Sequence, residues 1–372
     1  MKTLGIIAEY NPLHSGHRSH LARSREISGC SAIVGIISGN FVQRGEPAIW
    51  DKWRRTRMAL ESGIDLVIEL PLYYATGSSG YFAGGAVALL DKMGIADSLC
   101  FGSEWGDIEA LRECALKLSD EEAQFKSRLK KYLGQGLSFP AARAKAAEIA
   151  LPDTPNNVLG VEYVRAIINM GSKIVPYTVP RSQGSAKEVR EVIKKGGILP
   201  EGGIEYGPVE NFADLDNLSN IFRYILMTQT NLQDYVDVSE GLENRLIKCA
   251  EELQLISEII SAAKTKRYTY LRLQRAALHM ILGVTKKNIA AYESKGGPQY
   301  IRVLGFRKDR VHLLRLLEER ASLPVIVNLK NTRLHPLGAQ MLEEEVRSSR
   351  VYSLAYSGGV FLNEYRMPLV LE

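Results

Sequence analysis

Few cysteines, no long apolar run and no paired metal-ligand motif characterise this 372-residue sequence, and each lack excludes a class of protein. Its four cysteines lie far apart without a Cys-x-x-Cys pair, which argues against a zinc site or a disulfide framework and favours a reducing compartment. No apolar run approaches about 18 residues, and the first residues lack the apolar stretch and cleavage site of a signal peptide. We therefore expect a cytoplasmic protein without a membrane segment.

Neither sign of charge is in large excess. The chain has 47 Lys and Arg against 42 Asp and Glu, which gives a net charge of +5. That balance permits a polyanion to approach one positive face, but it does not by itself predict a nucleic-acid partner. The apolar and charged fractions are those of an ordinary globular protein, and the length favours two domains.

Short apolar runs alternate with helical patterns in the first half of the chain. They predict parallel strands at residues 4–7, 32–37, 66–70, 98–101 and 172–179. Such an order is typical of a Rossmann-like α/β fold with a doubly wound parallel sheet, whose strand ends line a ligand crevice. We expect this domain to cover residues 1–200.

The second half has a different pattern. A glycine- and proline-rich stretch at residues 196–208 predicts a linker. Beyond it the apolar residues repeat with helical spacing at residues 215–228, 240–263, 268–282 and 311–319. We therefore expect a mainly α-helical C-terminal domain over residues 201–372.

A histidine motif, His14-Ser15-Gly16-His17, follows the first predicted strand directly and precedes a predicted helix. Its two imidazoles can face a bound polyphosphate, while the glycine allows close backbone approach and the helix directs free N–H groups at the anion. The motif therefore predicts a nucleoside triphosphate site and attack on an α-phosphate. A simply solvated histidine remains the alternative.

The order of strand, His-x-Gly-His and helix resembles the signature of the nucleotidylyltransferase superfamily, whose Rossmann-like fold is shared with class I aminoacyl-tRNA synthetases. Longer blocks are similar to the bacterial tRNA(Met) cytidine acetate ligase family, and the likeness spans nearly the whole chain. These blocks are residues 38–49, 51–53, 65–71, 101–104, 155–163, 240–245 and 264–275.

The resemblance implies an enzyme that makes acetyladenylate from ATP and acetate and passes the acetyl group to N4 of the wobble cytidine of elongator tRNA(Met). His14 and His17 would be the catalytic residues, stabilising charge on the α-phosphate and the pyrophosphate. Acetate is already ionised, so the first step needs positioning and electrostatics and no general base. ATP is the expected cofactor, with Mg2+ as a candidate helper for the leaving pyrophosphate.

The resemblance also implies an ATP site around the histidine motif and at three later positions. Gly102 could instead be a turn glycine, Asn157 a helix N-cap and Arg181 a solvated charge, and the role of Glu9 stays open between holding Mg2+, capping a backbone group and orienting a histidine. The full set is Ile7, Ala8, Glu9, Tyr10, Asn11, His14, Gly16, His17, His20, Gly102, Asn157, Arg181 and Ser182.

A second phosphate signature is expected in residues 182–190, where Ser185 and Arg190 are the candidates. The segment between Arg181 and Ser185 is shorter than in the family pattern. That leaves open which of Arg181, Lys187 and Arg190 meets the phosphates. Two further histidines, His279 and His335, have no partner motif and are expected to be structural.

Two basic runs, residues 50–57 and 264–275, are the candidates for RNA contact. Their cations can pair with phosphates, and Trp50, Trp53, Tyr268 and Tyr270 could pack on ribose or bases. A solvated surface is the alternative for the cations, and a core position is the alternative for Trp53. The expected RNA-binding residues are Lys52, Arg54, Arg55, Lys264, Arg267, Arg272 and Arg275.

Two other functions stay open from the sequence alone. A nucleotidylyltransferase that acts on a small phosphorylated acceptor would release pyrophosphate only with that acceptor and not with acetate. A catalytically idle RNA-binding relative would bind nucleotide without turnover.

Overall fold

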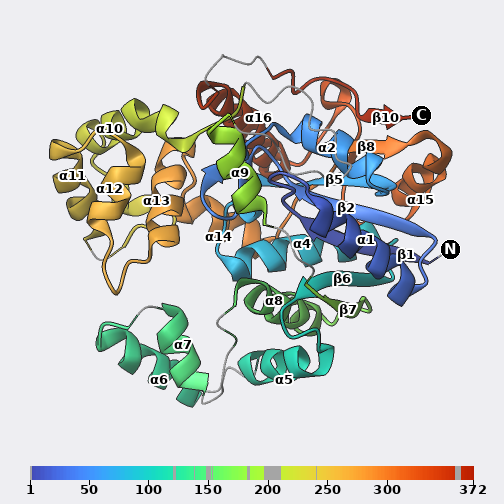
Figure 1. Ribbon diagram of the computed structural model, residues 1–372, viewed down its shortest axis with the longest axis horizontal. Helices are drawn as coiled ribbons and strands as arrows, with labels where there is room; N and C mark the ends of the chain where they lie inside the picture. Colours follow the sequence, from blue (N-terminus) through green and yellow to red (C-terminus); the bar gives the residue numbers. More distant parts are fainter. Residues whose placement is uncertain are drawn as a thin grey trace.

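The computed structural model describes residues 2–119, 123–137, 139–147, 152, 154–181, 185–196, 211–239, 241–356 and 362–372. Within these ranges one eight-stranded sheet has the order β10-β8-β5-β2-β1-β6-β7, with β9 paired to β8 (Figure 1). All neighbours are parallel except β5 and β8, which are antiparallel. The strands are β1 (Thr3–Ala8), β2 (Ala32–Ser38), β5 (Leu66–Leu70), β6 (Ser98–Ser103), β7 (Val175–Pro180), β8 (Ile301–Arg307), β9 (Val325–Ile326) and β10 (Leu369–Leu371).

Five of these strands, β1, β2, β5, β6 and β7, confirm the predicted parallel sheet. Every residue of β2 is buried, because helices cover both faces of the sheet, and this burial explains its continuous apolar sequence. Ile33 and Ile37 pack with helices on one face, while Val34 and Ile36 pack with helices on the other.

The first face is covered by α1 (Ser15–Ser28), α2 (Lys52–Glu61) and α9 (Ala186–Lys194). The opposite face is covered by α4 (Ser79–Met93), α5 (Ile108–Ser119) and α8 (Pro155–Met170), with the short α3 (Leu72–Ala75) before α4. A small hairpin of β3 (Phe41–Val42) and β4 (Glu46–Pro47) follows β2. α6 (Ala123–Gly134) and α7 (Phe139–Ala147) pack on each other between α5 and α8 in the chain.

The helical part of the second half lies beside the sheet (Figure 1). Residues 240–263, expected as one helical stretch, form two helices. The elements are η1 (Leu215–Leu218), α10 (Ser219–Thr228), η2 (Leu232–Asp234), α11 (Leu242–Glu252), α12 (Ile256–Ala263), α13 (Tyr270–Leu282), α14 (Lys286–Ser294), η3 (Lys308–Arg310), α15 (His312–Arg320), η4 (Leu329–Asn331) and α16 (Pro336–Leu354).

The expected division at residue 200 needs a correction, because the sheet does not end there. β8, β9 and β10 come from the second half of the chain and extend the sheet beyond β5. β8 runs antiparallel to its neighbour, so no strand-helix-strand pattern announces it in the sequence. The linker expected at residues 196–208 lies outside the described residues, except for Gly196.

A buried ion cluster fastens this C-terminal extension to the sheet. Lys52 Nζ lies 2.6 Å from Glu69 Oε1 and 2.7 Å from Glu364 Oε2. Arg302 on β8 joins the same two carboxylates at 2.9 and 2.8 Å. Lys52 is fully buried, so the expectation that it contacts RNA is wrong.

Arg55 is also fully buried, contrary to its expected role at an RNA surface. Its guanidinium donates to the backbone carbonyls of Glu9, Ser38 and Gly39, which are the ends of β1 and β2. The side chains of Trp50 and Trp53 lie in the core beside it. This basic run is therefore mostly interior, because α2 presents one side to the sheet.

The described part of the chain was expected to lack a membrane-spanning helix, a disulfide framework and a zinc site. No helix there is long and apolar enough to cross a bilayer. The four cysteines are free thiols. The described side chains include no group of three His, Cys, Asp or Glu residues placed to hold a metal ion.

Candidate active site

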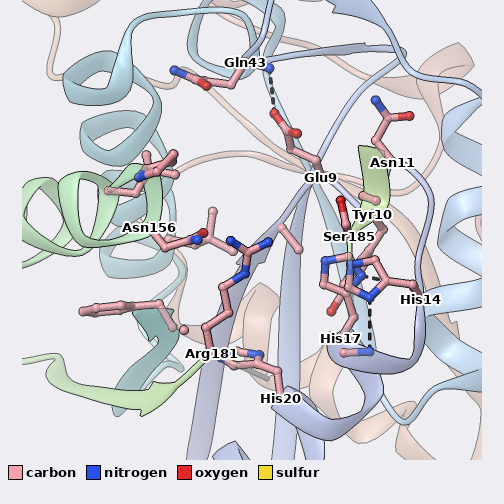
Figure 2. A pocket seen from close by; sticks show the side chains of 18 of the residues that line it. Glu9, Tyr10, Asn11, His14, His17, His20, Gln43, Asn156, Arg181 and Ser185 are labelled. Atoms are coloured by element: carbon pink, nitrogen blue, oxygen red, sulfur yellow. Dashed lines mark hydrogen bonds between the residues drawn. The ribbon is translucent and has the colours of Figure 1, made fainter. Parts of the chain in front are cut away.

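A pocket of about 380 Å³ opens at the carboxyl ends of β1 and β6. Residues from β1, the histidine motif, α1, the β3–β4 hairpin, α8, α9 and α13 line it (Figure 2). The expected ATP-site residues found in the lining are Ile7, Ala8, Glu9, Tyr10, Asn11, His14, Gly16, His17, His20, Gly102 and Arg181, together with Ser185 and Arg190.

His14 and His17 form a capping box at the start of α1. His14 is the N-cap, and its Nδ1 accepts the Gly16 N–H at 3.1 Å. His17 Nδ1 accepts the His14 N–H at 3.2 Å. Because both Nδ1 atoms are acceptors, each neutral ring carries its proton on Nε2. Both Nε2–H groups are then available to a ligand in the pocket that these rings line.

The environment keeps these rings neutral. Burial and the neighbouring Arg181 lower the pKa of His14 to about 4. Burial, the adjacent histidines and Arg181 lower the pKa of His17 well below its usual value. The ring centroids are only 3.8 Å apart, so protonating both would place two like charges in contact. The pair is thus suited to donate hydrogen bonds to an anion.

The approach to this pair is fixed by unusual backbone. Tyr10 has a φ of +48°, a left-handed conformation that non-glycine residues adopt rarely. Its ring is buried and meets His17 edge-on with 5.0 Å between the centroids. The Asn11 amide oxygen accepts the Ile49 N–H at 2.7 Å, and the Asn11–Pro12 peptide is cis. The Tyr10 conformation and the Asn11 hydrogen bond therefore define the turn on which the histidines stand.

His20 and Gly102 form a second wall of the pocket. Burial lowers the pKa of His20 to about 4. A Cβ added at Gly102 would meet nothing closer than the His20 ring, at 3.7 Å. The backbone at the end of β6 is therefore open to a flat ligand such as a nucleoside.

Two arginines bring positive charge to the site. Arg181, which follows β7, lies 3.6 Å from Glu104 and remains half exposed. Arg190 on α9 donates to the Asn11 carbonyl at 2.5 Å and lies 3.5 Å from Glu46. Ser185 is the N-cap of α9 and accepts the Glu188 N–H at 3.3 Å. The start of α9 thus faces the pocket, as the second phosphate signature predicts.

Glu9 is the residue whose role the sequence left open. Its Oε1 accepts the Gln43 N–H of the β3–β4 turn at 2.8 Å, as Figure 2 shows. Burial raises the pKa of this carboxyl, against the opposing charges of Arg44 and Arg190. Of the three roles considered, capping a backbone group is the one seen.

Asn157 is not part of the described lining, so its expected nucleotide contact stays a prediction. Its buried side chain accepts the Trp105 N–H and donates to Thr154 Oγ1. Thr154 is the N-cap of α8, so Asn157 is not a cap. The neighbouring Asn156 lines the pocket instead and donates to Glu104. Ser182 lies outside the described residues.

The basic run at residues 264–275 is not one helical face. Lys264 is the C-cap of α12, and α13 begins only at Tyr270. Lys264 and Arg267 are exposed, as an RNA contact requires. Arg272 and Arg275 are half-buried and bonded to Ser239 and Asp237, and Tyr268 is buried. Tyr268 is therefore not free to stack on a base, whereas an RNA contact of Arg272 or Arg275 stays a prediction.

The third expected RNA contact of the first run, Arg54, stacks 3.7 Å above the Trp50 ring and is half-buried. His279 is buried with its Nε2 3.2 Å from the Thr76 carbonyl, which confirms a structural role. His335 is the exposed N-cap residue of α16.

Several pocket residues were missed from the sequence. They come from segments distant in the chain and include Arg23, Gln43, Arg44, Phe82, Phe101, Asn156, Leu159, Tyr163 and Leu271. Most of them lie in the blocks that resemble the family, at residues 38–49, 101–104, 155–163 and 264–275, while Arg23 and Phe82 lie in none of these blocks. Leu271 shows that α13 contributes to the same wall.

A doubly wound parallel sheet with a His-x-Gly-His turn after its first strand defines a nucleotidyl transferase of the HIGH class. A family model described as HIGH Nucleotidyl Transferase matches residues 1–363. The tRNA(Met) cytidine acetate ligase of Thermoanaerobacter sp. (strain X514) is 37% identical over 389 residues, covering 96% of each chain. That of Caldanaerobacter subterraneus subsp. tengcongensis is 38% identical over 395 residues, with the same coverage.

Solved structures agree with this assignment. Thermotoga maritima TmcAL bound with alpha-thio ATP superposes with a TM-score of 0.89 at 31% identity, over 100% of both chains. The apo form of the same protein gives a TM-score of 0.91. The chain belongs to the tRNA(Met) cytidine acetate ligase family.

Proposed function

We propose that this protein is an ATP-dependent acetate ligase that forms acetyladenylate and transfers its acetyl group to N4 of the wobble cytidine of elongator tRNA(Met). The observation that carries the chemistry is the pair of neutral imidazoles, His14 and His17, with their Nε2–H groups available to the pocket. The family supplies the substrates, since the relatives are named for this reaction.

In the first step an acetate oxygen attacks the α-phosphorus of ATP, and the bond from that phosphorus to the pyrophosphate oxygen breaks. The Nε2–H groups of His14 and His17 donate to phosphate oxygens as negative charge shifts toward the leaving group. Arg181 and Arg190 add positive charge at the same rim. No proton moves from acetate, so the protein needs only to position the reactants and stabilise charge.

ATP would lie with its nucleoside over Gly102, beside Asn156, and its phosphates at the N-terminus of α1. Among the described lining residues Glu9 is the sole carboxylate. Any Mg2+ would therefore be held mainly by the phosphates, as is usual for this ion. It would neutralise charge on the departing pyrophosphate.

The α10–α13 part is proposed to hold the tRNA. It adjoins the pocket through Leu271 and presents the exposed cations Lys264 and Arg267. Cytoplasmic localisation follows from a tRNA substrate and is part of the same proposal.

The test is to incubate the purified protein with ATP, Mg2+, labelled acetate and elongator tRNA(Met) transcript, omitting each in turn. Label on a tRNA cytidine that requires ATP, acetate and tRNA supports the ligase. Bound ATP without label would favour an idle RNA-binding relative. Pyrophosphate released only with another acceptor would favour a small-molecule transferase.

A further inference from the structure

Acetyl transfer requires a proton acceptor that the adenylation step does not. The cytosine N4 amine forms a bond to the acetyl carbon, the bond from that carbon to the AMP oxygen breaks with its electron pair going to AMP, and one N4 proton must leave. The exocyclic amine is a weak nucleophile because its lone pair is delocalised into the ring. A positioned base in the pocket would therefore accelerate this step.

Most titratable groups of the pocket are unsuited to accept that proton. His14 and His17 use Nδ1 to accept backbone N–H groups, so their Nε2 atoms are donors. Burial raises the pKa of Tyr10 and of Tyr163, which keeps both phenols protonated. The remaining lining cations have no lone pair to offer.

Glu9 is different. Only its Oε1 is engaged, by the Gln43 N–H, and Oε2 has no hydrogen-bond partner within the described part of the chain. In the view of Figure 2, Glu9 and Gln43 occupy the upper part of the pocket, while His14, His17 and Arg181 lie below them. A carboxylate oxygen is also the group that accepts from cytosine N4 in nucleic-acid recognition.

The side of the pocket where Glu9 stands adjoins the helical part. The β3–β4 turn that Glu9 holds packs directly on α13, since a Cβ added at Gly45 would lie 2.6 Å from the Arg275 backbone nitrogen. α13 in turn supplies Leu271 to the lining. Glu9 and the β3–β4 turn thus lie on the side of the pocket that adjoins the helical part.

We propose that Glu9 receives the cytidine in the second step, with Oε2 accepting an N4–H hydrogen bond and then removing that proton as the amine attacks the acetyl carbon of acetyladenylate. The carboxyl afterwards passes the proton to solvent or to the departing AMP. This assignment rests on the proposed function and gives the protein a residue specific to acetyl transfer.

Burial raises the pKa of Glu9, and the charges around it modify that shift. Arg44 on the hairpin and Arg190 on α9 favour its ionised form, and Glu46 opposes it. Arg55 on α2 and Tyr163 on α8 face it from the neighbouring elements. Because a base acts when deprotonated, the transfer rate should rise with pH through the pKa of Glu9.

The deciding variant is Glu9→Gln, whose amide oxygen can still accept the Gln43 N–H and so keeps the hairpin in place. Acetate-dependent exchange of pyrophosphate into ATP reports the first step. Single-turnover transfer from synthetic acetyladenylate to the tRNA transcript reports the second. We expect the transfer rate to fall by about 100-fold or more beyond any fall in the exchange rate. The pH dependence of the transfer rate should also disappear.

Glu46→Gln is the matched control, because it removes one carboxylate from the hairpin to which Glu9 is bonded, at a position outside the pocket lining. If Glu46→Gln lowers activity, we expect the exchange rate to fall, because Glu46 lies beside Arg190 at the phosphate side of the pocket. The transfer rate should not fall selectively. Equal losses in both steps for Glu9→Gln, or unchanged transfer, would overturn the assignment. Absence of acetate-dependent exchange in the unmodified protein would instead overturn the proposed function, and this assignment with it.

Discussion

Replacing Lys52 by methionine should destabilise the fold strongly and leave the RNA surface unchanged. Lys52 Nζ lies 2.6 Å from Glu69 and 2.7 Å from Glu364, and all three side chains are almost fully buried. Burial favours the neutral form of Glu364, but Lys52 and Arg302 outweigh it and lower the pKa of that carboxyl below its usual value. Glu364 is therefore ionised in the folded protein, and removing Lys52 leaves Arg302 alone to compensate the two buried acidic side chains.

Removing one partner of a buried ion pair costs about 3–5 kcal/mol. The loss should show as a lower urea midpoint, followed by circular dichroism at pH 7.5. The loss of stability should also be smaller at lower pH, because protonation of a carboxyl neutralises the charge that Lys52 no longer compensates. Suppose that one carboxyl of the variant is protonated in the folded state and ionised in the unfolded state over this pH range. The free energy of unfolding then rises by about 1.4 kcal/mol for each unit by which the pH is lowered, or by about 2.7 kcal/mol from pH 7.5 to pH 5.5.

The matched control is Arg57→Met, which removes an exposed cation from the same helix and should change the free energy of unfolding by less than about 0.5 kcal/mol. Two results would refute the reasoning. One is a Lys52→Met protein of unchanged stability with weakened tRNA binding, since that would place Lys52 on the surface. The other is a loss of stability that is the same at both pH values.

Three further outcomes are expected. His14→Ala should abolish acetate-dependent pyrophosphate exchange and cost about 1 kcal/mol in thermal unfolding, because the Gly16 N–H loses its acceptor; His14→Asn should restore the stability but not the exchange. Gly45→Ala should cost more than about 1 kcal/mol, since its φ is +83° and the added Cβ would press on the Arg275 backbone; a stable variant would contradict this packing. Lys264→Ala should weaken tRNA binding and reduce its salt dependence without altering stability, as filter binding over a salt series can measure.

The sheet and the histidine site could be predicted because both depend on local patterns. Continuous apolar runs mark β1 and β2, which are buried on both faces, and the histidine motif stands in the turn that directly follows β1. β8 escaped prediction because its partner β5 precedes it by more than 230 residues and runs antiparallel to it. Its place in the sheet depends on long-range pairing that no local pattern encodes.

The errors among the basic residues have one physical cause. A charged side chain is placed by the partners that surround it, and those of Lys52 are Glu69 and Glu364, the latter more than 300 residues away. A sequence window therefore cannot distinguish a buried, paired lysine from a solvated one. Asn156 lines the pocket while its neighbour Asn157 does not, because a shift of one position on a helix turns a side chain by about 100°.

The position of α13 links the two halves of the proposed reaction. Acetyladenylate is a reactive mixed anhydride of acetate and AMP that water can hydrolyse. Transfer in the pocket where it forms therefore avoids its loss. Leu271 of α13 lines the ATP pocket, and the β3–β4 turn packed on α13 is bonded to Glu9 at the end of β1. The helical part that is proposed to hold the tRNA thus forms a wall of the chamber in which the acetyl group is activated. Transfer can then proceed by bringing the cytidine into the pocket, without release of the intermediate to water.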